Sequence, residues 1–157
     1  PERQTVDLEE LVSMVVAELA PFAISEGYEI AFESGPGPIP MQADKEALER
    51  AFGNLIRNAV QYAGRTGEIA VRVLADGSVS VSDQGPGIAV DKRSRIFSPF
   101  YRISPSGSGA GLGLNMVRQI VESHGGAVQL IPHEGPGSTF VVTWRPGTVS
   151  DKLARHR

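Results

Sequence analysis

Cysteine is absent from this sequence of 157 residues, and so are long apolar runs and a signal sequence. Without cysteine the chain cannot form disulfides, cysteine-ligated zinc clusters or a catalytic thiol, which fits a reducing, cytoplasmic setting. No apolar run reaches the roughly 18–20 residues needed to cross a bilayer. Residues 1–4 lack the basic-then-apolar pattern of a signal peptide, and we interpret them as a boundary inside a longer protein.

Long basic runs are also missing, and the formal net charge is −3. Nucleic acid is therefore not expected as the main partner. With 41% hydrophobic and 21% charged residues, the composition is that of an ordinary globular protein. The length suffices for one domain with a single core. We expect this domain to cover residues 1–148 and residues 149–157 to form a flexible basic C-terminal tail.

What the sequence does contain is a regular alternation of helix and strand patterns. Apolar residues at helical spacing predict helices over residues 8–22, 44–62 and 113–124, the first capped by Asp7. Alternating apolar residues predict strands over residues 28–33, 68–74, 78–82, 127–131 and 139–144. Asp76-Gly77 reads as a two-residue hairpin turn. The pattern predicts an α+β fold, a two-layer α/β sandwich with about three helices on one face of a mixed five-stranded sheet.

The 18 glycines gather mainly in the second half of the chain. Residues 83–111 are rich in Gly, Pro and Ser, with one short helical pattern over residues 90–97. This stretch is too long for an ordinary connection. We therefore expect a binding loop here, with residues 97–111 acting as a mobile lid.

Polar residues on the second predicted helix form the first candidate site. Asn54, Asn58 and Gln61 lie at i, i+4 and i+7, so their side chains share one stripe at the margin of the apolar face. Asparagine is a poor helix former, so two of them in mid-helix need a reason. An amide oxygen suits Mg²⁺ when a triphosphate already supplies the negative charge. The alternative is that these are ordinary solvated side chains.

A second candidate follows a predicted strand directly, in the sequence Asp-Gln-Gly-Pro-Gly-Ile from Asp83 to Ile88. A carboxylate accepts hydrogen bonds only and can select an exocyclic amino group such as that of adenine. Gly85 and Gly87 would let the backbone approach a flat ring without a Cβ in the way. The alternative is a simple turn that leaves a strand.

The third candidate is a run of alternating glycines that leads into the third predicted helix: Gly107, Gly109, Gly111 and Gly113. Backbone amides at a helix start form an anion site. The spacing is not that of a P-loop or of a dinucleotide-binding unit. The alternative is a flexible hinge with a helix cap.

In order along the chain, these motifs resemble the signature boxes of the histidine-kinase ATP-binding family. Its Bergerat fold is shared with gyrase, mismatch-repair and heat-shock ATPases. The matching segments are residues 54–59 (N box), 83–88 (first glycine box), 95–102 (F box), 109–114 (second glycine box), 124–126 (His-Gly-Gly) and 135–140 (last box). The resemblance covers essentially the whole chain.

The resemblance implies a role for each matching position. Asn58 would bind Mg²⁺, and Asn54, the predicted catalytic residue, would lie beside it near the phosphates. Asp83 would bind the adenine amino group, and Thr139 would lie beneath the base. The other expected ATP contacts are Tyr62, Gly85, Gly87 and Ile88 around the ring, and Gln61, Arg102, Gly109, Gly111, Leu112, Gly113 and Leu114 near the phosphates.

Two departures from the family pattern affect these expectations. The family often has Lys or His where this chain has Gln61, so a cationic phosphate contact is lost or comes from elsewhere, for example Arg102. Residues 103–108 are also short for a lid.

The resemblance implies a function in two-component signalling. The chain would transfer the γ-phosphate of Mg²⁺–ATP to a histidine on a separate dimerisation and acceptor domain, and act indirectly on a response regulator. The parent would be anchored in the bacterial inner membrane, and the fragment would be monomeric. His124, His133 and His156 are not in the family's phosphoacceptor context. The chain alone is thus expected to lack autophosphorylation, and His124 to have a structural role at a helix end.

Other functions within this fold differ at one position. ATP hydrolases such as gyrase resemble one another in carrying a glutamate four residues before the metal-binding asparagine. Here that residue is Asn54, which cannot accept a proton at pH 7. This argues against hydrolysis and against a serine kinase of anti-sigma type. A nucleotide-binding regulator without transfer activity stays open, as do the signal and the cognate response regulator.

Overall fold

Three helices lie side by side in the computed structural model, which describes residues 3–35, 37–62, 67–85, 95–97, 110–131 and 137–150. They are α1 (Leu8–Ser25), α2 (Lys45–Tyr62) and α4 (Ala110–Ser123). Each contributes an apolar stripe to the core, as its sequence spacing predicts. The Asp7 carboxylate caps α1 by accepting a hydrogen bond from the Glu9 amide at 3.1 Å.

The main sheet has five strands in the order β2-β4-β5-β7-β6. They are β2 (Glu29–Ser34), β4 (Glu68–Val73), β5 (Val79–Asp83), β6 (Gly126–Ile131) and β7 (Ser138–Trp144). The β2–β4 pair is parallel and the other pairs are antiparallel. A separate antiparallel pair joins β1 (Gln4–Asp7) to β3 (Pro40–Ala43).

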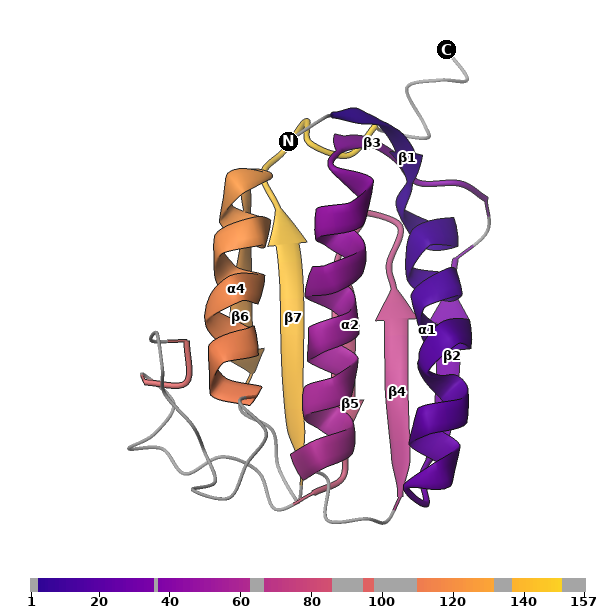
Figure 1. Ribbon diagram of the computed structural model, residues 1–157. Coiled ribbons are helices and arrows are strands. Elements are labelled where there is room, and N and C mark those ends of the chain that lie inside the picture. The colour runs from indigo at the N-terminus through magenta and orange to yellow at the C-terminus, as the bar shows by residue number, and fades with distance from the viewer. Residues whose placement is uncertain are drawn as a thin grey trace.

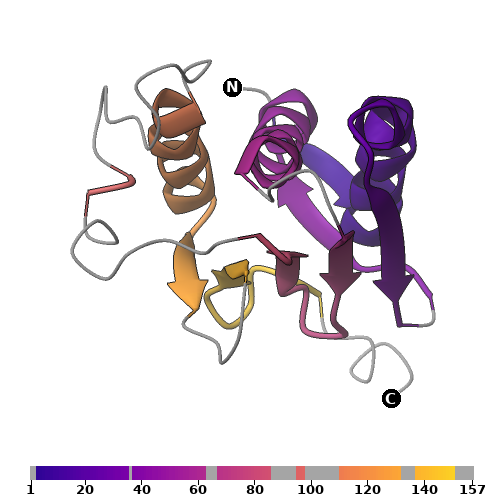
Figure 2. The same ribbon diagram turned by 90° about the horizontal axis from the view of Figure 1, so that it is seen from below.

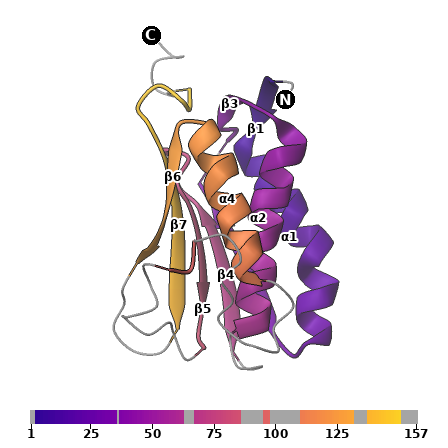
Figure 3. The same ribbon diagram turned by 60° about the vertical axis from the view of Figure 1, so that its left-hand side comes forward.

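All three helices cover the same face of the main sheet (Figure 1). Figure 2 shows the two layers end-on, with no described helix on the opposite face, and Figure 3 shows the same separation from the side. Leu48, Phe52 and Leu55 of α2 are fully buried against Val79 and Val81 of β5. The expected two-layer sandwich with a mixed five-stranded sheet is confirmed.

One local expectation is wrong, and one strand pair was not predicted. The turn between β4 and β5 is not a two-residue hairpin: the Leu74 amide bonds to the Ser78 carbonyl, and three residues lie between them. Gly77 adopts a φ of +87°, the left-handed conformation that closes a three-residue loop. The β1–β3 pair was also not expected, because each strand has only four residues and β3 begins with proline.

The expected C-terminal tail is attached to the domain at its start. Val149 forms a β-bridge with Met41, and the Ser150 amide donates to the Pro40 carbonyl at 2.9 Å. Residues 151–157 lie outside the described part of the chain. None of the described helices is long and apolar enough to cross a membrane.

Candidate functional site

Most of the candidate residues that the structure describes lie at one end of the sandwich, the lower end in Figure 1. The second half of α2, the start of α4, the end of β5 and the start of β7 meet there (Figure 1). These segments are far apart in the sequence. Side-by-side packing of α2 and α4 on the sheet brings them together.

Asn58 is buried at this end, with 5% of its surface exposed. Its Nδ2 atom has no hydrogen-bond partner. An unpaired buried amide costs roughly 1–3 kcal/mol, and such groups are rare in native proteins. The two ends of an amide are assigned from their surroundings, so a 180° turn would place the side-chain oxygen at the same point. The alternative that Asn58 is a solvated side chain is therefore wrong.

Asn54 lies one turn earlier on α2 and is half-buried against the start of α4. Its Nδ2 atom is 4.0 Å from the Met116 sulfur. A Cβ built on Gly113 would lie 3.5 Å from the Asn54 amide, so the two helices approach closely here. Gln61, one turn beyond Asn58, is exposed. The structure thus brings Asn54 to the start of α4, buries Asn58 one turn further along α2, and leaves Gln61 in solvent.

Asp83 ends β5 and is buried, with 8% exposed. Its Oδ1 atom accepts a hydrogen bond from the Gly85 amide at 2.9 Å, which turns the chain away from the strand. The carboxylate is therefore held in a fixed position at the end of the sheet. The next side chain, Gln84, accepts from the Glu68 amide at 3.0 Å and ties the end of β5 to the start of β4.

The structure puts Thr139 on the wrong face of the sheet for its expected place beneath a base. Its hydroxyl is hydrogen-bonded to that of Ser82 at 2.9 Å, on the face without helices. Ser138 is the register partner of Asp83 and is buried, with 7% exposed. Since neighbouring residues on a strand point to opposite faces, Ser138 replaces Thr139 at the site. Ser138 lies two residues before the buried Phe140 on β7, and this spacing was the sequence signal that both side chains share one face of the sheet.

The start of α4 contributes backbone groups. The helix begins at Ala110, three residues earlier than expected, so Gly111, Leu112, Gly113 and Leu114 form its first turn. The opening amides of a helix have no partner inside the helix. Leu114 is buried, with 1% exposed, and fixes this turn on the core.

Several expected contacts cannot be placed. Gly87, Ile88, Arg102 and Gly109 lie outside the described residues, as do the side chains of Tyr62 and Leu112 and most of the expected lid. Of the F box, residues 95–97 are described. Ile96 is fully buried, and the Phe97 ring packs edge-on against Phe140 at 6.0 Å.

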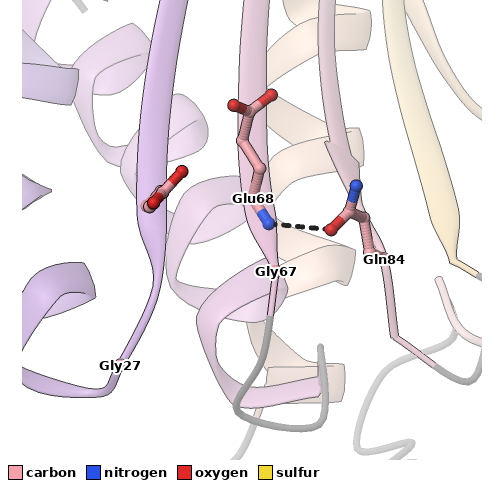
Figure 4. A pocket seen from close by; sticks show the side chains of 5 residues that line it. Gly27, Gly67, Glu68 and Gln84 are labelled. Atoms are coloured by element: carbon pink, nitrogen blue, oxygen red, sulfur yellow. Dashed lines mark hydrogen bonds between the residues drawn. The ribbon is translucent and has the colours of Figure 1, made fainter.

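An open pocket of about 440 Å³ lies at the ends of β2, β4 and β5 (Figure 4). Gly27, Glu29, Gly67, Glu68 and Gln84 line it. Glu29 and Glu68 are register partners on parallel strands. Glu68 alternates with Ile69 of the core, so it points to the face without helices. The pocket is therefore on the other side of the sheet from Asn58.

The sequence profile of the "Histidine kinase-, DNA gyrase B-, and HSP90-like ATPase" family matches residues 43–148. The sensor histidine kinase ZraS of Escherichia coli K12 is 36% identical over 152 residues, which cover 95% of this chain and 32% of ZraS. CpxA of the same strain is 34% identical over 149 residues, or 91% of this chain and 32% of CpxA. The chain thus spans about a third of the length of these relatives.

Solved structures of the same fold also match. The nucleotide-free catalytic domain of the histidine kinase ThkA superimposes with a TM-score of 0.81 at 27% identity, covering 90% of this chain and 94% of that domain. Full-length ShkA in complex with AMPPNP gives 0.76 at 33% identity, covering 90% of this chain and 30% of ShkA.

Proposed function

Since the chain belongs to the family of histidine kinase-, DNA gyrase B- and HSP90-like ATPases, we propose that it is the catalytic domain of a sensor histidine kinase. In this proposal it binds Mg²⁺–ATP between α2, β5 and α4, and the γ-phosphate passes to a histidine on a separate dimerisation and acceptor domain. Family membership by itself implies nucleotide binding. The metal ion, the residue roles and the transfer reaction are the proposed part.

The observation that carries the proposal is the buried amide of Asn58 without a hydrogen-bond partner. A ligand that fills this position would remove its cost. Among the described residues, no three His, Cys, Asp or Glu side chains converge on a possible metal site. A single neutral amide is a weak ligand, so it fits a Mg²⁺ ion whose charge is already met by phosphate oxygens. When bound, that ion would neutralise charge on the phosphates.

Asp83 supports an adenine nucleotide. A buried carboxylate fixed by the Gly85 amide is a pure acceptor and can take a hydrogen bond from the 6-amino group of adenine. The Ser138 hydroxyl lies on the same face of the next strand and is available to a neighbouring ring atom. ShkA, which was crystallised with an ATP analogue, supports this choice of nucleotide.

Asn54 favours transfer over hydrolysis. A general base for water must accept a proton at working pH, and an amide cannot. Asn54 contacts Gly113 at the start of α4 and is the residue beside the phosphates in this proposal. It would orient without activating water, which preserves the γ-phosphate for an acceptor histidine placed in line.

The remaining parts concern the parent protein. We propose that its acceptor domain is the direct partner of this chain and that a response regulator is the next recipient. The parent would be anchored in the bacterial inner membrane with this domain in the cytoplasm. Residues 1–148 would form the domain, which is monomeric when isolated.

A transfer assay tests the proposal. The chain is incubated with γ-labelled ATP and Mg²⁺, first alone and then with the acceptor domain of its parent as a separate polypeptide. We expect label on the added domain only, stable to base and lost in acid. Nucleotide binding without transfer would reject the kinase and leave a nucleotide-binding regulator. Label on His124 of the isolated chain would overturn the assignment of the acceptor.

A further inference from the structure

The α2–α4 pair, which carries most of the proposed site, packs through the apolar core and has polar contacts near both of its ends. The first is at the site, where Gly113 and Met116 of α4 contact Asn54 of α2. The second is at the other end, where His124, just past α4, meets Asp44, just before α2. At about 1.5 Å per residue, the two contacts lie roughly 15 Å apart along the helices.

The second contact fixes the protonation state of His124. Its Nε2 atom is 3.1 Å from the Asp44 backbone nitrogen, which can only donate, so Nε2 must carry a lone pair. Its Nδ1 atom is 2.8 Å from the Ile120 carbonyl, which can only accept, so Nδ1 must carry the proton. The ring is buried, with 6% exposed. Both contacts are satisfied only by the neutral Nδ1–H tautomer.

Asp44 is itself the cap of α2. Its carboxylate accepts from the Ala47 amide at 3.2 Å, and its carbonyl accepts from the Leu48 amide at 3.0 Å. Its own amide is left to donate outward, to His124. The hydrogen bond between the Asp44 amide and His124 therefore attaches α2 to the end of α4 at the residue that caps α2.

The backbone conformation and close packing after His124 require glycine at the next two positions. Gly125 adopts a φ of +76°, which a side chain would strain. A Cβ on Gly126 would lie 2.6 Å from the Thr143 carbonyl and 2.9 Å from Val121. The His-Gly-Gly sequence thus holds the end of α4 tightly between the cap of α2 and strand β7.

We propose that His124 is a positioning residue for nucleotide binding, which holds α2 in register with α4 so that Asn54 and Asn58 face the first turn of α4. This inference rests on the proposed function, because it assumes that the nucleotide lies between these helices. His124 touches neither nucleotide nor metal. It acts through the hydrogen bond to Asp44, about 15 Å from the site.

The contact is sensitive to pH. Protonation places a second N–H group against the Asp44 amide and breaks the hydrogen bond. The charged groups facing the ring are Arg3, whose guanidinium donates to the adjacent Ser123 carbonyl at 2.8 Å, and the Asp44 carboxylate. Burial lowers the pKa of His124 below its usual 6.5, and Arg3 adds to this against the opposing effects of the Ile120 carbonyl and Asp44. The neutral form therefore dominates at pH 7.5.

Two substitutions separate positioning from folding. His124→Gln keeps an acceptor at about the position of Nε2 and cannot titrate, whereas His124→Leu keeps bulk and loses the acceptor. We expect His124→Leu to weaken Mg²⁺–ATP affinity about five- to tenfold at pH 7.5. The measurement is made at 10 °C, after circular dichroism has been used to check that the variant is folded. His124→Gln should stay within about twofold of the unmutated chain. His133→Gln is the control for removing a histidine.

Affinities are then compared between pH 7.5 and 5.5. The terminal phosphate titrates in the same range, so the relevant quantity is the ratio of the unmutated chain to His124→Gln at each pH. This ratio should fall toward low pH. The ratio of His133→Gln to His124→Gln should fall in the same way, because His133→Gln keeps His124. The amide resonances of Gly113 and Asn54 should shift in His124→Leu and not in His124→Gln.

A folded His124→Leu that binds as tightly as the unmutated chain would reject the inference and leave His124 a purely structural residue. A ratio that stays constant while the His124 ring resonances report its protonation would reject it as well. Failure of the unmutated chain itself to bind Mg²⁺–ATP would instead reject the proposed function, so the two failures are distinguishable.

Discussion

The two ends of the α2–α4 pair differ in whether their buried polar groups have hydrogen-bond partners. At the His124 end, both ring nitrogens, the Asp44 amide and carboxylate, and the Ser123 carbonyl all have hydrogen-bond partners. At the site end, Asn58 is as deeply buried and its Nδ2 atom has none. The same helix therefore has a hydrogen-bonded polar cluster where it begins and an unpaired buried amide nitrogen where the candidate site lies.

The difference indicates that the His124–Asp44 contact stabilises the fold, whereas the unpaired Asn58 amide is suited to binding a ligand. A satisfied polar network rigidifies the core, whereas an unpaired polar atom costs stability unless something binds to it. Functional sites commonly carry such a cost. Four tests can break or sharpen this contrast.

Gly126→Ala changes the His124 end of the α2–α4 pair and should have the largest effect on stability. Its Cβ would lie 2.6 Å from a backbone carbonyl, so the free energy of unfolding should fall by about 3 kcal/mol. Gly113→Ala is the matched change at the site end, where the new Cβ meets Asn54 at an ordinary 3.5 Å. It should raise stability by about 0.5–1 kcal/mol. Urea unfolding measures both, and equal effects would contradict the contrast.

Asp83→Asn tests the base-binding role. The substitution keeps the acceptor for the Gly85 amide but replaces a charged acceptor, which is worth roughly 1.5–3 kcal/mol. The preference for ATP over GTP should therefore drop about 10–100-fold in competition titrations. Equal binding of GTP and ATP by the unmutated chain would show that Asp83 does not select the base.

Asn58 should show affinity and stability moving in opposite directions. Asn58→Leu removes the unpaired amide, so we expect the free energy of unfolding to rise by about 1 kcal/mol. ATP affinity should fall about tenfold when Mg²⁺ is present and barely change in its absence. Calorimetry with and without Mg²⁺ gives both affinities. Equal losses in the two conditions would reject Asn58 as the metal ligand.

The pH dependence of stability tests the satisfied end. The unfolded chain protonates His124 near pH 6.5, while burial lowers the pKa in the folded chain. Between these values the unfolded state binds the additional proton, so the free energy of unfolding falls as the pH drops below about 6.5. Above that range the contribution is fully present. The free energy of unfolding of His124→Gln, measured in urea, should lack this slope, and a slope of the same size in the variant would assign it to another group.

The helices and the main sheet could be predicted because periodicity reports burial directly. All three helices and all five strands of the main sheet were expected, with bounds that differ by up to three residues. The β1–β3 pair could not be, since four-residue strands give too short a pattern. Gly77 was recognised as a turn residue, but hydrogen bonding at Leu74 and Ser78 sets the length of the loop.

The site could be predicted in part. Asn54, Asn58 and Asp83 stood out because polar residues interrupt apolar patterns. Ser138 was missed although its two-residue spacing from Phe140 indicated which face it occupies, and its pairing with Asp83 in the structure places it at the site end of the sheet. The bond between His124 and Asp44 joins residues 80 positions apart and leaves no local signal.

Strand order also governs when the site can exist. β7 lies between β5 and β6, so Asp83 lacks its neighbour on that side until residues 138–144 have been made. During synthesis, the N-terminal helices and β2, β4 and β5 can associate first, but their sheet ends in an open edge. Closing it requires a contact across more than fifty residues, which slows folding. A ribosome-bound chain that stops before β7 would therefore expose the β5 edge to chaperones. The proposed nucleotide site would be completed only after β7 has paired with β5.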